Sequence, residues 1–419
     1  MSLSKPSDGI LETPVTWEEF ESNIRTALNT EARLGPNKSV FDIGEGIGFA
    51  SRCCLIAYDW VGAAADEKLP SRVVLKIPSA LPFRRLNESL PPGQRMFDGD
   101  DAMWEMMEGN LRKTHNVEVA TYDFFGQFEG VSMPKKYYGK PFGEEDKIGG
   151  QLCIEYMENS RMMNFNDKYS IELVKQIARA IGKLNAFSLL KEPIAPELQK
   201  NLMDEFAETV DMEGFKGMFK GLVTLDDSEK TKDLLEKLDA MLPDYLGSTF
   251  MGALHKKMGV RPVLVNGDLR TENILIDKDS GDLAALIDWQ CTHPGIGLED
   301  LHRIAMFSLT TEERHTHFPM LIEEMYKSLV ENLNGAEPPY SLDTLILLSD
   351  ILFPHCALFF GGPSIALIAN QDKDPRLSNE EKAKRKEVMM EKLMGALEDA
   401  IVYDVKNKTH TGNLDFRKK

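Results

Sequence analysis

Two short apolar runs in the second half of the chain constrain its fold most, because helical patterns surround them on both sides. They are RPVLVNGDLRTENILID (261–277) and DLAALIDWQ (282–290), and their β-branched residues and flanking turn residues predict strands. Asp268 and Asn273 lie on the loop that enters one strand, and Asp288 follows the next strand. Asp and Asn also favour turns and strand ends for purely structural reasons. Carboxylate and amide oxygens are, however, the ligands of hard cations such as Mg²⁺, so the trio predicts a metal and base group.

The rest of the chain divides by its hydrophobic period. Up to about residue 157, strands predicted at SVFDI, ASRCCLIAYDW, RVVLKIP and QLCIEYM accompany an N-terminal helix, WEEFESNIRTAL, capped by Thr16 and ending near Gly35. A long helix is predicted from Ala102 to Phe128, and an exposed loop from Ser79 to Asp100. Beyond residue 157 the 3.6-residue period of helices dominates. The prediction is an α+β protein with a small, mostly antiparallel part and a larger helical part.

Composition excludes several classes of protein. Forty-nine Lys and Arg against 67 Asp and Glu give a net charge of −18, which opposes general binding of nucleic acid. Five scattered cysteines suggest neither a disulfide framework nor a zinc site, and the N-terminus has no apolar signal segment. We therefore expect a cytoplasmic protein with no nucleic-acid partner and no obligate protein partner. The uncharged stretch Ile351–Ala369 is interrupted by Pro354 and Gly361, and is predicted to form a buried pair of core helices and no membrane span.

The order Asp268, Asn273, Asp288 resembles the protein-kinase-like superfamily, in which a catalytic loop precedes a metal-binding Asp. More narrowly, NGDLRTENILI and IDWQ resemble the HGDxxxxN and IDFQ signatures of the choline-kinase-like small-molecule kinases. That branch includes aminoglycoside, choline and ecdysteroid kinases and a nematode group of uncharacterised relatives. The resemblance runs from Val40 to Leu301, with residues 263–301 the specific part. It implies a two-lobed protein-kinase-like fold, with an N-terminal lobe at 1–157 and a helical C-terminal lobe at 158–419.

The resemblance also implies roles for residues of the N-terminal part. Gly44, Gly46 and Gly48 match the loop whose backbone amides approach the phosphates of ATP, although an ordinary hairpin turn would use glycines as well. Lys76 matches the strand lysine on the α- and β-phosphates, and Glu118 matches the helix glutamate that pairs with it. Glu118 could also belong to a solvated helix face.

In the same way, the segment 154–157 resembles the one that binds adenine, through the carbonyl of Glu155 and the amide of Met157. The resemblance implies Asp268 as catalytic base, Asn273 and Asp288 as Mg²⁺ ligands, and ATP as phosphate donor. Two positions depart from the family pattern: Asn266 and Asn185 stand where histidines are usual. Since Asn can also donate a hydrogen bond to backbone, the loop geometry can survive the first exchange.

The acceptor is predicted to be the hydroxyl of a small metabolite or xenobiotic. Only eleven residues separate Asp288 from Asp300, and Trp289 and Gln290 replace the Phe-Gly of protein kinases, which leaves no room for a long activation segment. Asp300 itself is interpreted as a structural helix N-cap. The acidic run at 204–213 could meet a cationic acceptor or could be a solvated helix face. The histidines at 255, 293, 302, 315, 317 and 355 show no metal-binding spacing and are interpreted as packed or surface residues.

Two other functions remain open from the sequence. One is a nucleotide-binding pseudokinase that regulates a partner without turnover, which Asn266 and Asn185 favour. The other is a helical scaffold with no nucleotide site. ATP and Mg²⁺ should stabilise a kinase or a pseudokinase thermally, but not a scaffold.

Overall fold

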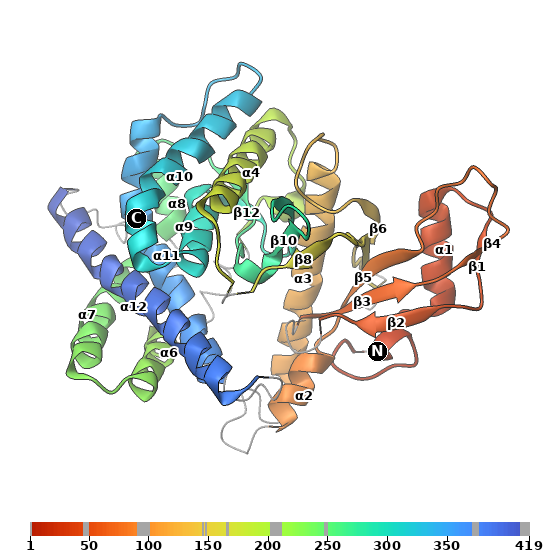
Figure 1. Cartoon of the computed structure of the whole chain (residues 1–419), viewed down its shortest axis with the longest axis horizontal. Coiled ribbons are helices and arrows are strands. Elements are labelled where there is room, and N and C mark those ends of the chain that lie inside the picture. The colour runs from red at the N-terminus through yellow and green to blue at the C-terminus, as the bar shows by residue number, and fades with distance from the viewer. Residues whose placement is uncertain are drawn as a thin grey trace. The chain divides into compact units, whose positions relative to one another are not determined.

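The computed structural model describes residues 2–44, 50–89, 101–144, 146, 149–164, 167–201, 212–246, 250–370 and 377–410. The chain forms two compact units (Figure 1). Unit 1 comprises Met1–Glu129 and Met133–Asn159, and unit 2 comprises Gly130–Ser132 and Ser160–Lys419. The predicted α+β class is confirmed, with an antiparallel sheet in unit 1 and mainly helices in unit 2.

Unit 1 is built on a five-stranded antiparallel sheet of order β2-β3-β5-β7-β6, beside a small two-stranded sheet of β1 and β4 (Figure 1). Its elements are α1 (Trp17–Leu28), β1 (Arg33–Leu34), β2 (Ser39–Asp42), β3 (Ser51–Ala57), β4 (Trp60–Val61), β5 (Arg72–Pro78), α2 (Leu81–Ser89), α3 (Asp101–Phe125), β6 (Lys136–Lys140) and β7 (Gln151–Glu155). A short 3₁₀ turn, Ile10–Glu12, precedes them.

The alternation of strand β5 decides which face of the sheet carries Lys76. Val73, Leu75 and Ile77 are fully buried in the core that α1 closes with Phe20 and Ile24. Because successive side chains of a strand point to opposite faces, Lys76 points to the other face. Helix α3 lies on that face, since its Glu118 contacts Lys76. The sequence pattern of β5 therefore sends the lysine to the side opposite the core.

Unit 2 is mainly helical, with two small antiparallel sheets of order β11-β10-β8 and β12-β9. Its elements are β8 (Ser160–Met162), α4 (Ile171–Leu190), α6 (Met212–Leu225), α7 (Glu229–Tyr245), α8 (Phe250–Met258), β9 (Val263–Val265), β10 (Ile274–Asp277), β11 (Leu283–Leu286), β12 (His293–Gly295), α9 (Leu298–Ser308), α10 (Thr311–Asn332), α11 (Leu342–Asn370) and α12 (Asn379–His410). The two strands predicted around the polar loop are β9 and β10, and the strand before Asp288 is β11.

Three local predictions are wrong. Helix α1 ends at Leu28, because Asn29 adopts a left-handed conformation (φ 51°) that stops the helix well before Gly35. The predicted loop from Ser79 contains helix α2, because its Pro82 falls in the first turn, where proline is compatible with a helix. The predicted pair of core helices is one continuous helix, α11, with Pro354 and Pro363 inside it.

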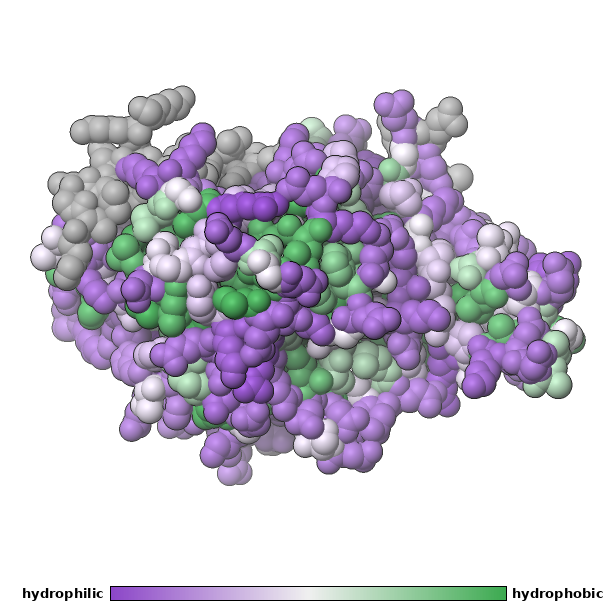
Figure 2. Space-filling model, turned by 90° about the horizontal axis from the view of Figure 1, so that it is seen from above, coloured by the Kyte–Doolittle hydropathy of each residue, from purple (hydrophilic) through white to green (hydrophobic). Residues whose placement is uncertain are grey.

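Helix α11 is the one described helix that is long and apolar enough to cross a membrane by length and composition. However, 72% of its most apolar window is buried inside the protein, as in the core helix of a globular unit. Figure 2 shows one face of the molecule, on which hydrophilic side chains predominate and hydrophobic ones form smaller patches. The predicted burial of the stretch 351–369 is therefore confirmed.

Candidate active site

Lys76 and Glu118 form a close ion pair in unit 1. The Nζ atom of Lys76 lies 3.0 Å from Oε1 and 2.8 Å from Oε2 of Glu118. The side chain of Glu118 is only 3% exposed and that of Lys76 13%, so Glu118 does not belong to a solvated helix face. The predicted pairing is thus present. A lysine held in this way offers a fixed positive charge, and its role in binding phosphate stays a prediction.

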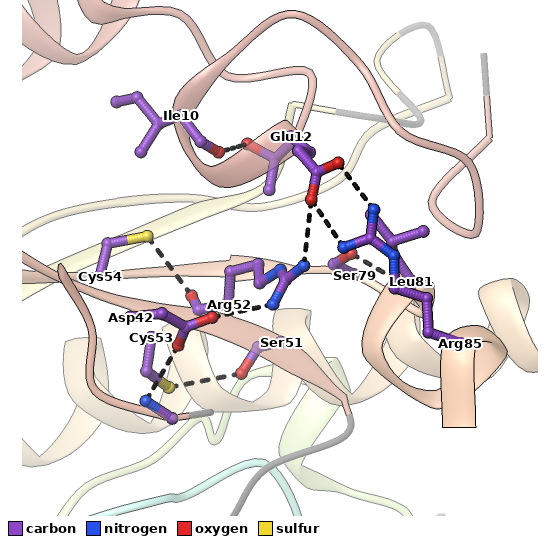
Figure 3. Close-up of polar contacts among 12 residues, drawn as sticks. Ile10, Glu12, Asp42, Ser51, Arg52, Cys53, Cys54, Ser79, Leu81 and Arg85 are labelled. Carbon is purple, nitrogen blue, oxygen red and sulfur yellow. Dashed lines mark hydrogen bonds and ion pairs between the residues drawn. The ribbon is translucent and has the colours of Figure 1, made fainter. Parts of the chain in front are cut away.

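The first of the three predicted loop glycines lies directly after β2. The amide of Gly44 donates a 3.0 Å hydrogen bond to Oδ1 of Asp42, whose Oδ2 accepts a 2.9 Å bond from Arg52 of β3 (Figure 3). Gly46 and Gly48 lie outside the described residues. The phosphate-binding role of the three glycines remains untested.

The two residues assigned to adenine lie at the end of β7. The amide of Glu155 donates to the carbonyl of Lys135 at 2.8 Å, and the Glu155 side chain is exposed. Met157 is half-buried just beyond the strand. Since both proposed contacts would be made by backbone atoms, side-chain positions do not test them.

In unit 2, Asn266 joins the loop of Asp268 to Asp288. Its side-chain oxygen accepts a 3.0 Å hydrogen bond from the Asp268 amide, and its side-chain nitrogen donates a 3.2 Å bond to the carbonyl of Asp288. The side chain of Asn273 donates a 2.8 Å bond to the carbonyl of Asp268. Asn266 therefore links the loop of Asp268 to Asp288, which lies 20 residues further along the chain, and Asn273 is tied to the same loop directly. The predicted brace by Asn266 is confirmed.

Asp300 supports the same loop from helix α9, and the N-cap prediction for it is wrong. The N-cap of α9 is Gly297, and Asp300 is the third residue of the helix. Its carboxylate is 3% exposed and accepts the amides of Asn266 at 2.7 Å and of Gly267 at 2.9 Å. Burial raises the pKa of Asp300 to about 6, against these two hydrogen bonds, which lower it.

Gly267 is the loop position that no other residue could fill without strain. Its φ is +79°, in the left-handed region, and a Cβ there would lie 2.4 Å from the carbonyl oxygen of Cys291. The requirement for glycine comes both from the backbone angle and from close packing against the segment after β11. It fixes the tight turn from which Asp268 projects.

Two arginines that sequence reasoning did not assign lie against Asp268. Arg303 of α9 donates to Oδ1 at 3.1 Å, and Nε of Arg270 lies 3.7 Å from Oδ2. Burial raises the pKa of Asp268, the two arginines lower it, and the charge of Asp288 raises it further. The net direction is upward, which makes Asp268 a stronger base than an ordinary aspartate. With 25% of its side chain exposed, it remains accessible to a reactant.

Asp288 has a backbone conformation that is uncommon for a residue with a side chain. Its φ is +60°, and such strain is concentrated at functional sites. Asn273 is buried and uses the nitrogen of its amide to hold the loop, so its oxygen is the atom suited to a cation. One carboxylate and one amide oxygen fit Mg²⁺, which usually keeps waters and substrate phosphates as its other ligands. Within the described residues, no three His, Cys, Asp or Glu side chains form a complete metal site by themselves.

The second departure from the family pattern is also accommodated. Asn185 on α4 is 1% exposed, and its side-chain nitrogen donates a 3.0 Å hydrogen bond to the carbonyl of Leu264 in β9. A Cβ at Gly297 would lie 1.9 Å from the side-chain oxygen of Asn185. The side chain of Asn185 therefore anchors β9 to α4, and Gly297, next to the start of α9, leaves room for that side chain.

The histidines are packed or exposed as predicted. His293 is buried and contacts the carbonyl of Cys291 at 2.8 Å and Glu299 at 3.2 Å. His302 is also buried and contacts the carbonyl of Ser349. These contacts are those of structural histidines. Of the acidic run at 204–213, residues 204–211 lie outside the described residues, while Glu213 is exposed and lies 3.0 Å from Lys216, so both interpretations of the run still stand.

Residues 3–408 match the model of a family described as "Uncharacterized oxidoreductase dhs-27", DUF1679. The chain belongs to this family. The DUF1679 description names an oxidoreductase, but every strand pair among the described residues is antiparallel. The parallel sheet of dinucleotide-binding folds is therefore not found in this part of the chain.

The other comparisons find similarity to a kinase-like protein and to solved kinases. An uncharacterised kinase-like protein of Caenorhabditis elegans is 24% identical over 296 residues, which is 70% of this chain and 74% of that protein. A choline kinase from Cryptosporidium parvum has a TM-score of 0.49 at 11% identity, with 94% of this chain and 98% of that chain covered. The GDP complex of an aminoglycoside 2'-phosphotransferase-IIIa has a TM-score of 0.45 at 12% identity, with 90% and 98% covered. Similarity of fold at this level does not identify a substrate.

Proposed function

We propose that this DUF1679 protein is an ATP-dependent small-molecule kinase that transfers the γ-phosphate of ATP to a hydroxyl group. The observation that carries the proposal is the bonding of the 266–273 loop, in which Asn266 links Asp268 to Asp288 and Asn273 holds the carbonyl of Asp268. Phosphoryl transfer depends on positioning and on charge neutralisation more than on covalent chemistry. A rigid loop with one base and two cation-binding oxygens supplies both. A cytoplasmic location is part of the proposal.

Each residue has a defined part in the reaction. Asp268 accepts the proton of the acceptor hydroxyl, the hydroxyl oxygen forms a bond to the γ-phosphorus, and the bond from that phosphorus to the bridging oxygen of ADP breaks. Lys76, fixed by Glu118, holds the α- and β-phosphates. Asn273 and Asp288 would hold Mg²⁺, which neutralises charge on the phosphate oxygens. In this proposal residues 1–157 bind the nucleotide, with the glycines from Gly44 to Gly48 and the backbone of Glu155 and Met157, and residues 158–419 carry out the transfer.

A small acceptor fits the chain better than a peptide. The eleven residues between Asp288 and Asp300 include strand β12, which pairs with β9, and the start of α9 at Leu298. Because β12 and the start of α9 lie within these eleven residues, no long extended segment on which a peptide could lie fits between Asp288 and Asp300. The acceptor is therefore proposed to be a small molecule with a free hydroxyl.

The pseudokinase alternative loses its main support. It rested on Asn266 and Asn185, and both asparagines make hydrogen bonds that hold β9 and its loop. The remaining difference between the two functions is turnover, which an experiment can measure directly.

The test is ATP consumption with Mg²⁺ and a library of small hydroxyl compounds, for the wild type and for Asp268→Asn. We expect an acceptor-dependent ADP release by the wild type, and a loss of several hundredfold in turnover with unchanged ATP affinity in the variant. The matched control is Asp343→Asn, because Asp343 is exposed in the first turn of α11. Near-normal phosphorylation by Asp268→Asn would refute the base assignment. Nucleotide binding without any acceptor-dependent turnover would favour the pseudokinase.

A further inference from the structure

We propose that residues 2–12, here called the N-terminal strap, position the Lys76–Glu118 pair by tying together the strand and the helix that carry it. The inference rests on the proposed function only in its expected effect on ATP binding. The strap contacts the two residues that directly follow β5, the first half of α3, and Arg52 of β3. All of these contacts lie within unit 1.

The first tie is an apolar anchor at Leu3. Its side chain is 2% exposed and packs in a cluster with Ala80 after β5, and with Trp104 and Leu111 of α3. The carbonyl of Leu3 accepts the amide of Ala80 at 2.9 Å. Ala80 is four residues after Lys76, and Leu111 is two helical turns before Glu118. Leu3 therefore links the segment that directly follows β5 to the helix that carries Glu118.

The second tie is polar and holds the same helix through Glu108. Its Oε1 accepts the amide of Ser4 at 3.1 Å and the Ser4 hydroxyl at 2.9 Å, and the hydroxyl of Ser2 also donates to it. Arg112 on the next turn contacts Oε2 at 3.0 Å. Burial raises the pKa of Glu108, but the hydrogen bonds from Ser2 and Ser4 outweigh it, so the net direction is downward. The carboxylate is therefore ionised and held by the strap, ten residues or about 15 Å along α3 from Glu118.

The third tie connects Glu12 to Arg52 of β3 and, through Arg52, to Asp42 at the end of β2. Leu11 and Glu12 have φ angles of +46° and +64°, a left-handed pair of residues without glycine, which marks a backbone held by its surroundings. The Glu12 carboxylate contacts Arg85 of α2 at two 2.7 Å distances and Arg52 of β3 at 3.5 Å (Figure 3). Arg52 in turn holds Asp42 at 2.9 Å.

The contacts of the strap lie on two different sides of unit 1. The main core of unit 1 lies between the sheet and α1, whereas the cluster of Leu3 lies against α3. Ile10 of the strap belongs to that main core, so it is loosening at the first residues of the strap, around Leu3 and Ser4, that should free α3 while leaving the core between sheet and α1 in place. The expected consequence is a weaker Lys76–Glu118 pair and a weaker hold on ATP.

The experiment measures Lys76 itself, in the full-length chain, with and without the proposed substrate. The variants are Glu108→Gln, which changes one atom type at a buried acceptor, and Leu3→Ala, which removes the anchor. Leu3→Met keeps the volume and is the conservative rescue. Glu324→Gln, at an exposed ion pair of unit 2 with Arg179, is the control. Near-ultraviolet circular dichroism verifies that each variant is folded.

The first measurement is the rate at which Lys76 reacts with an amine-acylating ester, followed by peptide mass spectrometry and normalised to exposed lysines. We expect Lys76 to react about 3- to 10-fold faster in Glu108→Gln and in Leu3→Ala. A rate increase of this size corresponds to a modest weakening of the Lys76–Glu118 ion pair. Leu3→Met and Glu324→Gln should react at the wild-type rate. Equal rates in all folded variants would overturn the proposal.

The second measurement separates this inference from the proposed function. The KM for ATP should rise in Glu108→Gln by about the factor seen in the Lys76 reaction, with a smaller change in kcat, since a fixed lysine contributes mainly to binding. Faster acylation with no ATP binding by any form would keep the strap and refute the kinase. ATP binding by all forms with unchanged acylation would keep the kinase and refute the strap.

Discussion

Replacement of Asp300 tests whether the loop of Asp268 is held as the structure indicates. The carboxylate accepts the amides of Asn266 and Gly267 and is almost fully buried. Asp300→Ala removes both acceptors and leaves two buried N–H groups. Asp300→Asn keeps one oxygen but turns an NH₂ group toward the second amide, so it should retain about one of the two bonds.

The magnitude follows from the two hydrogen bonds. A hydrogen bond to a charged group contributes about 1.5–3 kcal/mol, so losing both should cost about 3–6 kcal/mol of local stability. Losing one should cost about 2 kcal/mol. The charged form applies at pH 8, because burial raises the pKa of Asp300 only to about 6. Since about 1.4 kcal/mol is tenfold in an equilibrium, amide exchange should accelerate more than about 100-fold in Asp300→Ala and about 30-fold in Asp300→Asn.

The assay is hydrogen–deuterium exchange at pH 8, read by mass spectrometry on a peptide that covers residues 262–270. Asp343→Asn, an exposed change in α11, serves as the control and should leave this peptide unchanged. A peptide from α12 reports whether unit 2 as a whole has been destabilised. Wild-type exchange rates at Asn266 and Gly267 in Asp300→Ala would refute the idea that Asp300 holds the loop.

Two further predictions concern stability. Gly267→Ala should lower the free energy of unfolding, measured in urea, by about 2–4 kcal/mol, because Gly267 has a left-handed φ and lies close to the carbonyl of Cys291. Gly259 also has a left-handed φ but lies in open space, so Gly259→Ala should cost only about 1 kcal/mol, and equal losses would contradict the packing argument. Burial lowers the pKa of His115 to about 4, so the folded protein keeps this histidine neutral beside the carbonyl of Lys140. The free energy of unfolding should therefore fall as the pH falls from about 6.5 toward 4, by at most about 3 kcal/mol from this group. His115→Gln should flatten the dependence of unfolding free energy on pH over that range, and an unchanged slope would argue against a neutral buried histidine.

Several local contacts of the candidate site could be predicted from the sequence because their signals are local. The alternation in VVLKIP fixes the face of Lys76, and the spacing of Asp268 and Asn273 lies within one short loop. The exchange of histidine for Asn266 was interpretable because an amide can both donate and accept. In each case a pattern of a few neighbouring residues determines the geometry.

The parts that could not be predicted depend on contacts between distant segments. Asp300 and Arg303 contact the loop of Asp268 because α9, which begins about thirty residues later in the chain, packs against that loop. By sequence, Asp300 near a helix start is equally an N-cap. The strap residues Leu3 and Glu12 are likewise unremarkable alone, and only their partners on α3 and β3 reveal them. Helix α11 continues through its prolines because burial of an apolar helix outweighs their local cost.

The central claim is that this chain binds a Mg²⁺–nucleotide and that Lys76 and Asp288 both contribute to the binding. Calorimetric titration with a non-hydrolysable ATP analogue tests it directly, with and without Mg²⁺, for the wild type, Lys76→Met and Asp288→Asn. We expect binding by the wild type that weakens at least about tenfold without Mg²⁺, and a similar loss in each variant. Absence of binding by the wild type, or binding that is indifferent to Mg²⁺ and to both substitutions, would contradict the account.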